Sequence, residues 1–169
     1  MKRQLLTSCL VLLITGATAQ QNEWQDPRVN AVNRAPMHTN YFAYESDAIA
    51  EKGERTLSKN YLTLNGLWKF NWVKDADQRP TDFFHTDFSA KGWNYMKVPG
   101  LWELNGYGNP VSVNNQYPWR KQFEPNPPAI PIQNNHVGSY RKVIGIPADW
   151  NRKEVFAPFG SLTSNIYLW

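Results

Sequence analysis

The chain has 169 residues, of which 41% are hydrophobic and 14% aromatic, and its formal net charge is +4. This length is sufficient for one domain with a complete hydrophobic core, and the aromatic content excludes an intrinsically disordered chain. The lysines and arginines are scattered, without a basic run that would follow a phosphate backbone, so composition argues against a nucleic-acid-binding protein.

Residues 1–19 have the pattern of a secretory signal peptide. Two basic residues precede an apolar run over 5–14, and small residues at 17–19 provide a cleavage site. The apolar run is too short to span a bilayer as a helix. The single cysteine, Cys9, lies in this segment, so the mature chain has neither a disulfide nor thiol chemistry. We therefore expect an exported protein, periplasmic or secreted, that is not held at a membrane after cleavage.

Residues 20–60 predict an extended N-terminal arm and not a separate domain. They contain several prolines and asparagines, and the aromatic cluster at 41–44 has no clean periodicity. Within the arm, a short helical turn is expected that begins at Ser46 or Asp47 and ends at Gly53.

Alternation of apolar and polar residues begins at residue 61. The segments 61–64 and 67–72 both alternate, and Asn65-Gly66 between them has the sequence of a tight hairpin turn. Further strand signals lie at 95–98, 138–146, 154–160 and 164–169. The residues expected on the buried face are Leu64, Leu67, Trp68, Phe70 and Trp72. Because no long stretch has helical periodicity and the connections are irregular, the chain predicts an all-β fold, most simply a β-sandwich.

Between these strands, residues 98–119 form a long polar segment, VPGLWELNGYGNPVSVNNQYPW, with Glu103 as its single charge. By composition alone, an aromatic-rich corner of the core is the more frequent explanation of such a segment. Long ordered loops without charge are also often binding loops. Aromatic rings stack on the C–H face of a pyranose, and asparagine amides both donate to and accept from its hydroxyls. Trp102, Tyr117 and Trp119 are therefore expected either to stack on a sugar or to brace the loop against a neighbouring domain.

A set of short motifs follows a characteristic order along the chain. They are WQDP at 24–27, NRAP at 33–36, LNGLWKF at 64–70, VPGLWE at 98–103, GYGNP at 106–110, YPW at 117–119, NHVGSYR at 135–141 and FGSLTSN at 159–165. Each motif alone is weak, but the ordered set resembles the family 2 glycoside hydrolases, most closely their long bacterial β-galactosidases. The resemblance covers essentially all of the expected mature chain.

This resemblance implies a sugar-binding domain with the galactose-binding jelly-roll fold over 61–169, as the N-terminal part of a much longer glycosidase of carbohydrate metabolism. The whole protein would hydrolyse terminal non-reducing β-D-galactosides with retention. Its two catalytic glutamates would lie on a (β/α)8 barrel in the downstream domains of the same polypeptide. Any Mg and Na ions would also be bound mainly by those domains, so no cofactor is expected here. The family asparagine that contacts the galactosyl unit falls on Asn114.

Three positions depart from the family pattern, namely Ser112, Asn115 and Pro158. Proline cannot donate to a β-ladder, so Pro158 weakens the strand expected around it. The sequence also stops at Trp169 in mid-alternation, from which we expect a jelly roll that is incomplete at its C-terminus. Two alternatives therefore stay open: a free-standing secreted sugar-binding module without catalysis, and a nonfunctional remnant.

No catalytic or metal-binding constellation is expected within this chain. Retaining glycosidases hold two carboxyl groups about 5–5.5 Å apart, whereas the acidic residues here are dispersed. Glu23 follows an asparagine, as the family's catalytic acid does, but it lies three residues past the cleavage site on a chain end. The three histidines lack metal-ligand spacing, and His136 is expected to hydrogen-bond a loop. We therefore expect the chain alone to be inactive.

Overall fold

The computed structural model describes residues 23–36, 38–39, 41–109, 119, 121–124, 126–160, 162 and 165–169. The expected signal peptide over 1–19, Asn114 and Tyr117 lie outside the described residues. The longest regular elements are strands, and in the described ranges helix is limited to the short α1 and to single turns of 3-10 helix. The chain is therefore all-β, as predicted. Among the described residues, no helix has the length and apolar character needed to cross a membrane.

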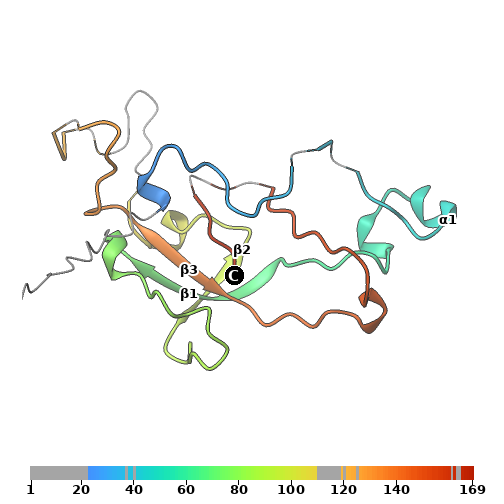
Figure 1. The fold of residues 1–169 in the computed structure, drawn as a ribbon. Helices are drawn as coiled ribbons and strands as arrows, with labels where there is room; N and C mark the ends of the chain where they lie inside the picture. The colour runs from blue at the N-terminus through green and yellow to red at the C-terminus, as the bar shows by residue number, and fades with distance from the viewer. Residues whose placement is uncertain are drawn as a thin grey trace, which may run out of the picture.

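The centre of the fold is a three-stranded antiparallel sheet of order β2-β1-β3 (Figure 1). Its strands are β1 (Gly66–Val73), β2 (Asn94–Val98) and β3 (Val137–Arg141). The two edges of β1 are paired over different parts of the strand, because β2 pairs with its first half from Gly66 to Phe70 and β3 with its second half from Lys69 to Val73. Both outer strands therefore meet at the middle of β1.

One face of this sheet is aromatic and carries the core. Phe70 is fully buried, and its ring lies 4.7 Å from Tyr140 on β3, its partner in the register. Met96 on β2 stands opposite Trp68 and is 1% exposed. Strand side chains alternate between faces, so Trp68, Phe70 and Trp72 share this face, as predicted. The predicted burial of Leu67 is wrong, because the same alternation turns it to the other face, where it is 64% exposed.

The opposite face of the sheet is formed by cations that lie over aromatic rings. The ammonium of Lys69 lies 4.0 Å from the centre of the Tyr95 ring, and the guanidinium of Arg141 lies 5.8 Å from that of Phe88. Arg141 also donates hydrogen bonds to the carbonyl oxygens of Phe88 and His85. This side chain therefore fixes the loop between β1 and β2 beneath the sheet.

The hairpin predicted at Asn65-Gly66 is absent. Residues 61–65 have no regular secondary structure, and Gly66, at φ +116°, is the first residue of β1. A two-residue hairpin would place Leu64 opposite Leu67, but Leu67 pairs with Lys97 of β2 instead. The carbonyl oxygen of Leu64 accepts from the Trp68 indole at 2.8 Å and the Lys142 ammonium at 2.9 Å, so side chains replace the ladder there.

The later strand predictions are confirmed only in part. The segment predicted at 138–146 is a strand at Val137–Arg141, and the described residues of 154–160 and 164–169 have no regular secondary structure. Among the described residues, no segment pairs with the outer edge of β2 or of β3. Within the described ranges the sheet is single, so the jelly-roll arrangement stays a prediction. Trp169 instead stacks on Phe84 with ring centres 5.7 Å apart.

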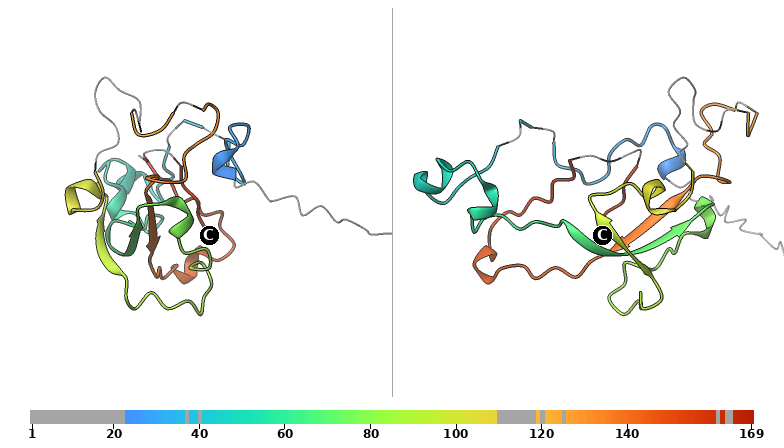
Figure 2. Two further views of the ribbon diagram at one scale, coloured as in Figure 1. Left: turned by 90° about the vertical axis from the view of Figure 1, so that its left-hand side faces the viewer. Right: turned by 180° about the vertical axis from the view of Figure 1, so that it is seen from behind.

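The arm carries α1 (Asp47–Ala50) well away from the sheet, as Figure 1 and the right-hand view of Figure 2 show. Ser46 is its N-cap residue and Gly53, at φ +67°, lies in the turn that follows, so the predicted helical turn is confirmed. Near it, the carboxylate of Glu45 accepts hydrogen bonds from the Ser58 hydroxyl and the Lys59 amide, and these bonds lower its pKa.

Candidate functional site

The segment that follows β2 folds back onto the aromatic face of the sheet. Its 3-10 turn η4 (Glu103–Asn105) is preceded by Trp102, whose ring centre lies 6.4 Å from that of Phe70. Tyr107 packs edge-on against the same ring at 4.9 Å. The indole N–H of Trp102 donates to the Glu103 carboxylate at 2.5 Å. Two aromatic side chains therefore fix the start of the 98–119 segment to the core.

Trp102 reaches β3 at Gly138, where only a hydrogen atom fits. A Cβ at Gly138 would lie 2.4 Å from Cζ3 of Trp102 and 2.8 Å from Cε2 of Phe70. The indole therefore rests directly on the backbone of β3. Gly138 stands opposite Trp72 of β1 in the register, which places this contact at the end of the sheet.

Gly108 makes a second close approach, to His136 and Trp72. A Cβ there would lie 2.8 Å from Nδ1 of His136 and 3.1 Å from Cζ2 of Trp72. The imidazole also packs edge-on against the Trp72 ring at 5.0 Å. The indole Nε1 of Trp72 is buried and has no hydrogen-bond partner among the residues that the structure describes.

Trp119 is attached to the segment that precedes β3. Its indole N–H donates to the carbonyl oxygen of Asn134 at 2.7 Å, and its own carbonyl oxygen accepts from the backbone N–H of Gln122 at 2.9 Å. Both Trp119 and Asn134 have left-handed backbone, at φ +62° and +51°. That conformation is uncommon for residues other than glycine and costs of order 1 kcal/mol or more, so surrounding contacts must maintain it.

Asn134 is the centre of a hydrogen-bond network. Its backbone N–H donates to the Asp75 carboxylate at 2.7 Å, and its side-chain amide donates to Oε1 of Gln122. Its Oδ1 lies 3.2 Å from Nε2 of His136, so the predicted hydrogen bond of His136 within a loop is confirmed. The network joins the turn after β1, the Gln122 segment and the residues just before β3.

Two titratable groups of this corner, His136 and Tyr140, have pKa values shifted towards their neutral forms. Burial lowers the pKa of His136 and Lys74 acts in the same direction, while the carboxylates of Glu103 and Asp75 oppose the shift. Burial also raises the pKa of the Tyr140 phenol, and Glu103 adds to that effect. Aromatic rings and amide groups gathered in this way are suited to neutral polar ligands.

Of the four residues predicted to bind or brace a sugar site, the structure describes Trp102 and Trp119. Trp102 packs on Phe70 and Gly138, whereas Trp119 is bonded to Asn134, and the described residues record no ring contact between the two indoles. Asn114 and Tyr117 lie outside the described residues. The sequence reasoning did not single out Asn134. Its signal was the Asn-Asn-His run itself, because asparagine tolerates left-handed backbone.

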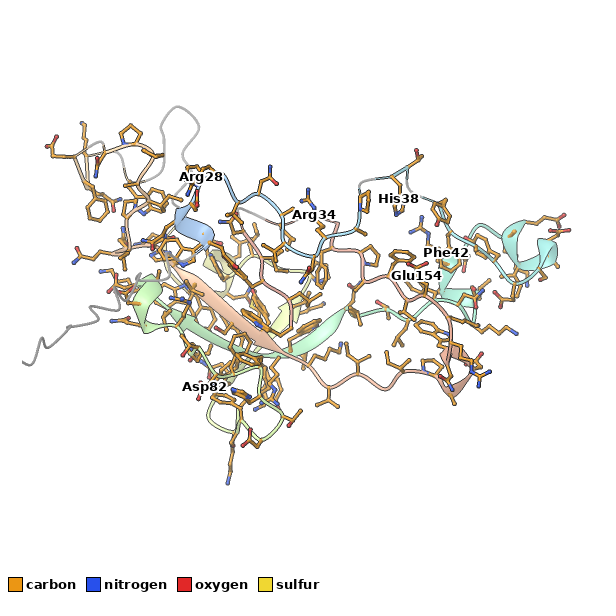
Figure 3. All side chains as sticks on the ribbon, in the orientation of Figure 1. Arg28, Arg34, His38, Phe42, Asp82 and Glu154 are labelled. Atoms are coloured by element: carbon orange, nitrogen blue, oxygen red, sulfur yellow. The ribbon has the colours of Figure 1, made fainter. Side chains whose placement is uncertain are left out.

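The described part of the chain contains no group of three or more His, Cys, Asp and Glu side chains that could hold a metal ion. Asp26, in the arm, is instead bound by Arg28 through both of its carboxylate oxygens, at 2.9 and 2.7 Å. This pairing lowers the pKa of Asp26 to about 2. A separate open cavity of about 290 Å³ is lined by Asp82, His85, Asp87 and Phe88. Asp82 and Arg28 project from opposite sides of the molecule (Figure 3).

The sheet and its aromatic, amide-bearing end define a β-domain whose surface suits a neutral polar ligand. Comparison with protein families makes this specific, because the model described as "Glycosyl hydrolases family 2, sugar binding domain" matches residues 61–169. The chain therefore belongs to the sugar-binding domain family of the family 2 glycosyl hydrolases.

Several proteins that are similar to this chain are named beta-galactosidases. The chain is 38% identical to the beta-galactosidase of Halalkalibacterium halodurans over 86% of its own length, and 34% identical to that of Priestia megaterium over 87%. It is also 31% identical over 87% of its length to the beta-galactosidase large subunit of Leuconostoc lactis. The chain spans only 14% of the length of the first two relatives and 25% of the third.

Proposed function

We propose that this chain is the sugar-binding N-terminal part of an exported β-galactosidase that hydrolyses terminal non-reducing β-D-galactosides with retention. The observation that carries the proposal is the 38% identity to a protein named beta-galactosidase over 86% of the chain. The family match over residues 61–169 supports the same assignment and extends to the last residue of the chain.

Within such an enzyme, this chain positions the substrate, and residues elsewhere in the polypeptide cleave the glycosidic bond. Asn114 orients the galactosyl hydroxyls with its amide, which can donate to one hydroxyl and accept from another. Trp102, Tyr117 and Trp119 stack on the sugar or brace the segment that carries Asn114. In support, the described pair Trp102 and Trp119 are held by a packed ring and a hydrogen bond, so both are preorganised before a ligand arrives.

The carboxylates near this corner are engaged in internal contacts. The Glu103 carboxylate accepts a hydrogen bond from the Trp102 indole, and the Asp75 carboxylate accepts one from the backbone N–H of Asn134. A retaining mechanism needs one carboxylate to attack the anomeric carbon and a second to protonate the leaving oxygen. We therefore assign both catalytic roles to residues outside this chain and expect the chain alone to be inactive.

The experiment that tests the proposal uses the complete product of the gene, with Asn114→Ala and the matched control Asn115→Ala. The complete product should hydrolyse a β-galactoside, and proton NMR of the first-formed sugar should show the β-anomer. Asn114→Ala should raise the dissociation constant for isopropyl β-D-thiogalactoside by about 10- to 100-fold, the loss of one or two hydrogen bonds, with little change for Asn115→Ala.

Other outcomes decide between the remaining functions. A complete product that binds the thiogalactoside without hydrolysing any β-galactoside would refute the enzyme and favour a free-standing binding module. A product that neither binds nor hydrolyses would identify a nonfunctional remnant. Equal losses for the Asn114 and Asn115 variants would refute the role given to Asn114.

A further inference from the structure

The chain contains two Asn-Gly steps, Asn65-Gly66 and Asn105-Gly106. In such a step the glycine nitrogen can attack the side-chain amide of the asparagine and release ammonia, because glycine has no Cβ to hinder the approach. Asn65-Gly66 has the sequence of a hairpin turn but forms none, and the proposed function uses neither step. The structure gives the two identical dipeptides different surroundings.

At the first step, both reacting groups are accessible. Asn65 is exposed, and among the described residues its side-chain amide has no hydrogen-bond partner. Gly66 is the first residue of β1, opposite Val98 at the end of the ladder with β2, and terminal pairs of a sheet open most easily. Its backbone, at φ +116°, is in a region that glycine adopts without strain.

At the second step, both reacting groups are engaged. The side-chain amide of Asn105 donates to the carbonyl oxygen of Leu101 at 2.8 Å. The backbone N–H of Gly106 donates to the carbonyl oxygen of Glu103 at 3.3 Å and closes the turn η4. Attack by the Gly106 nitrogen would require both hydrogen bonds to break, so this step is an internal control for the first.

A fixed cation lies on the peptide group of the first step. The ammonium of Lys142 donates to the carbonyl oxygen of Asn65 at 3.0 Å. It also donates to the carbonyl oxygen of Leu64 at 2.9 Å and lies 5.5 Å from the centre of the Trp68 ring. The Asn65 carbonyl belongs to the same amide as the Gly66 nitrogen. When that nitrogen loses its proton, amide resonance places part of the negative charge on this oxygen, where the ammonium stabilises it.

We propose that Asn65 is a site of intramolecular deamidation, which Lys142 promotes. The deprotonated Gly66 nitrogen forms a bond to Cγ of Asn65, the bond from Cγ to Nδ2 breaks, and ammonia leaves with the displaced proton. Water then opens the resulting succinimide ring by adding its hydroxyl to one of the two carbonyl carbons and returning a proton to the nitrogen. Opening at Cγ gives aspartate, and opening at the backbone carbonyl gives isoaspartate.

Either product changes the chain directly before β1. The neutral amide of Asn65 becomes a carboxylate, and the isoaspartyl product also lengthens the backbone by a methylene. The pairing of Gly66 with Val98 depends on the present backbone length, so the isoaspartyl product should loosen the start of β1. The reaction therefore marks aged copies of the protein at one position. It does not depend on the proposed function, because no step involves a sugar.

The first test follows both steps in the complete gene product by peptide mapping with mass spectrometry, after incubation in the native state and in urea. In the native state, deamidation at Asn65 should be about 10-fold faster than at Asn105, because hydrogen bonds engage the Asn105 amide and the Gly106 nitrogen. In urea both steps lose their contacts, and the two rates should become equal. A ratio that is the same in both states would overturn the selection of Asn65 by the fold.

The second test isolates the ammonium. Lys142→Met should slow deamidation at Asn65 about 10-fold and leave Asn105 unchanged, whereas Lys142→Arg, which keeps the charge, should restore much of the rate. A purely structural role of Lys142 predicts the reverse, because a looser segment lets Asn65 reach the glycine nitrogen more often. Lys153→Met removes a cation that donates to Asn60 instead, so it is the matched control and should change neither rate.

The outcomes are independent of the proposed function. An unchanged or faster reaction at Asn65 in Lys142→Met would overturn the promotion by the ammonium. Faster deamidation at Asn105 than at Asn65 in the native protein would overturn the site itself. Aspartyl and isoaspartyl peptides of equal mass should separate by chromatography, and the absence of both after long incubation would overturn the reaction. No readout uses a galactoside, so failure of the deamidation leaves the proposed function intact, and failure of the proposed function leaves the deamidation intact.

Discussion

The close packing of Trp102 and Phe70 against Gly138 predicts that Gly138→Ala destabilises the domain strongly. The added Cβ would lie 2.4 and 2.7 Å from two carbon atoms of the Trp102 ring and 2.8 Å from a carbon of Phe70. Carbon atoms in contact prefer about 3.5–4.0 Å, so the rings must move by about 1 Å or the strand must shift. Phe70 has no exposed surface and cannot move without disturbing the core.

Overpacking of this kind typically costs about 1–3 kcal/mol, and two rigid rings place Gly138→Ala at the upper end, about 2–3 kcal/mol. For a domain of this size, that cost lowers the melting temperature by about 6–12 °C. Gly145→Ala is the matched control, because nothing lies within 4 Å of a Cβ at that position. The control should be neutral or stabilising by about 0.4–1 kcal/mol, since alanine restricts the unfolded chain.

The assay is urea unfolding followed by tryptophan fluorescence and by far-ultraviolet circular dichroism, for wild type and both variants. Trp102→Leu introduced into Gly138→Ala should recover part of the loss, because a smaller side chain leaves room for the Cβ. The packing of Trp102 on β3 would be refuted by equal unfolding midpoints for Gly138→Ala and Gly145→Ala. Full additivity of the Trp102 and Gly138 substitutions would refute it as well.

Three further predictions concern the core, the opposite face and the arm. Phe70→Ala should cost about 3–5 kcal/mol in urea unfolding, whereas Leu67→Ala, at a 64% exposed position, should change stability by less than about 0.5 kcal/mol. Arg141→Gln should accelerate hydrogen exchange in the loop whose carbonyl oxygens the guanidinium binds, and equal exchange would contradict that contact. Arg28→Gln should raise the pKa of Asp26 in an NMR titration from about 2 towards its ordinary 3.8. In the wild-type protein the ion pair is present above the lowered pKa of about 2 and is lost as the pH falls through that value.

The parts of the fold that depend on local pattern could be predicted from the sequence. The alternation over 67–72 gave a strand, and Trp68, Phe70 and Trp72 share one face because the side-chain period of a strand is fixed. The helical turn at Ser46 was equally local, since its start and its closing glycine lie within one short segment.

The predictions that failed depended on competition between distant segments. Asn65-Gly66 has a strong hairpin sequence, but β1 pairs with β2 and β3, and the carbonyl of Leu64 is satisfied by Lys142, 78 positions away. The strand signals near the C-terminus failed for a related reason, because alternation indicates a strand without saying which edge receives it.

The candidate site was predictable in its composition and not in its connections. The aromatic residues of 98–119 predicted either stacking on a sugar or bracing of the loop against a neighbouring domain, and the structure packs Trp102 on Phe70 and bonds Trp119 to Asn134. The role of Asn134 depends on Asp75, which is 59 positions away, and no spacing rule relates the two. The role of such a residue can be recognised only from the folded structure.

The central position of β1 also has a consequence for the order of assembly. Its pairing with β2 closes loops of 24 to 32 residues, whereas its pairing with β3 closes loops of 64 to 72. By loop-closure entropy, the second step costs about 0.8 kcal/mol more than the first. During synthesis, β1 and β2 also leave the ribosome before β3. We therefore expect a nascent hairpin of β1 and β2 whose open edge is covered only when β3 arrives, so chaperone binding or strand exchange would act on that edge.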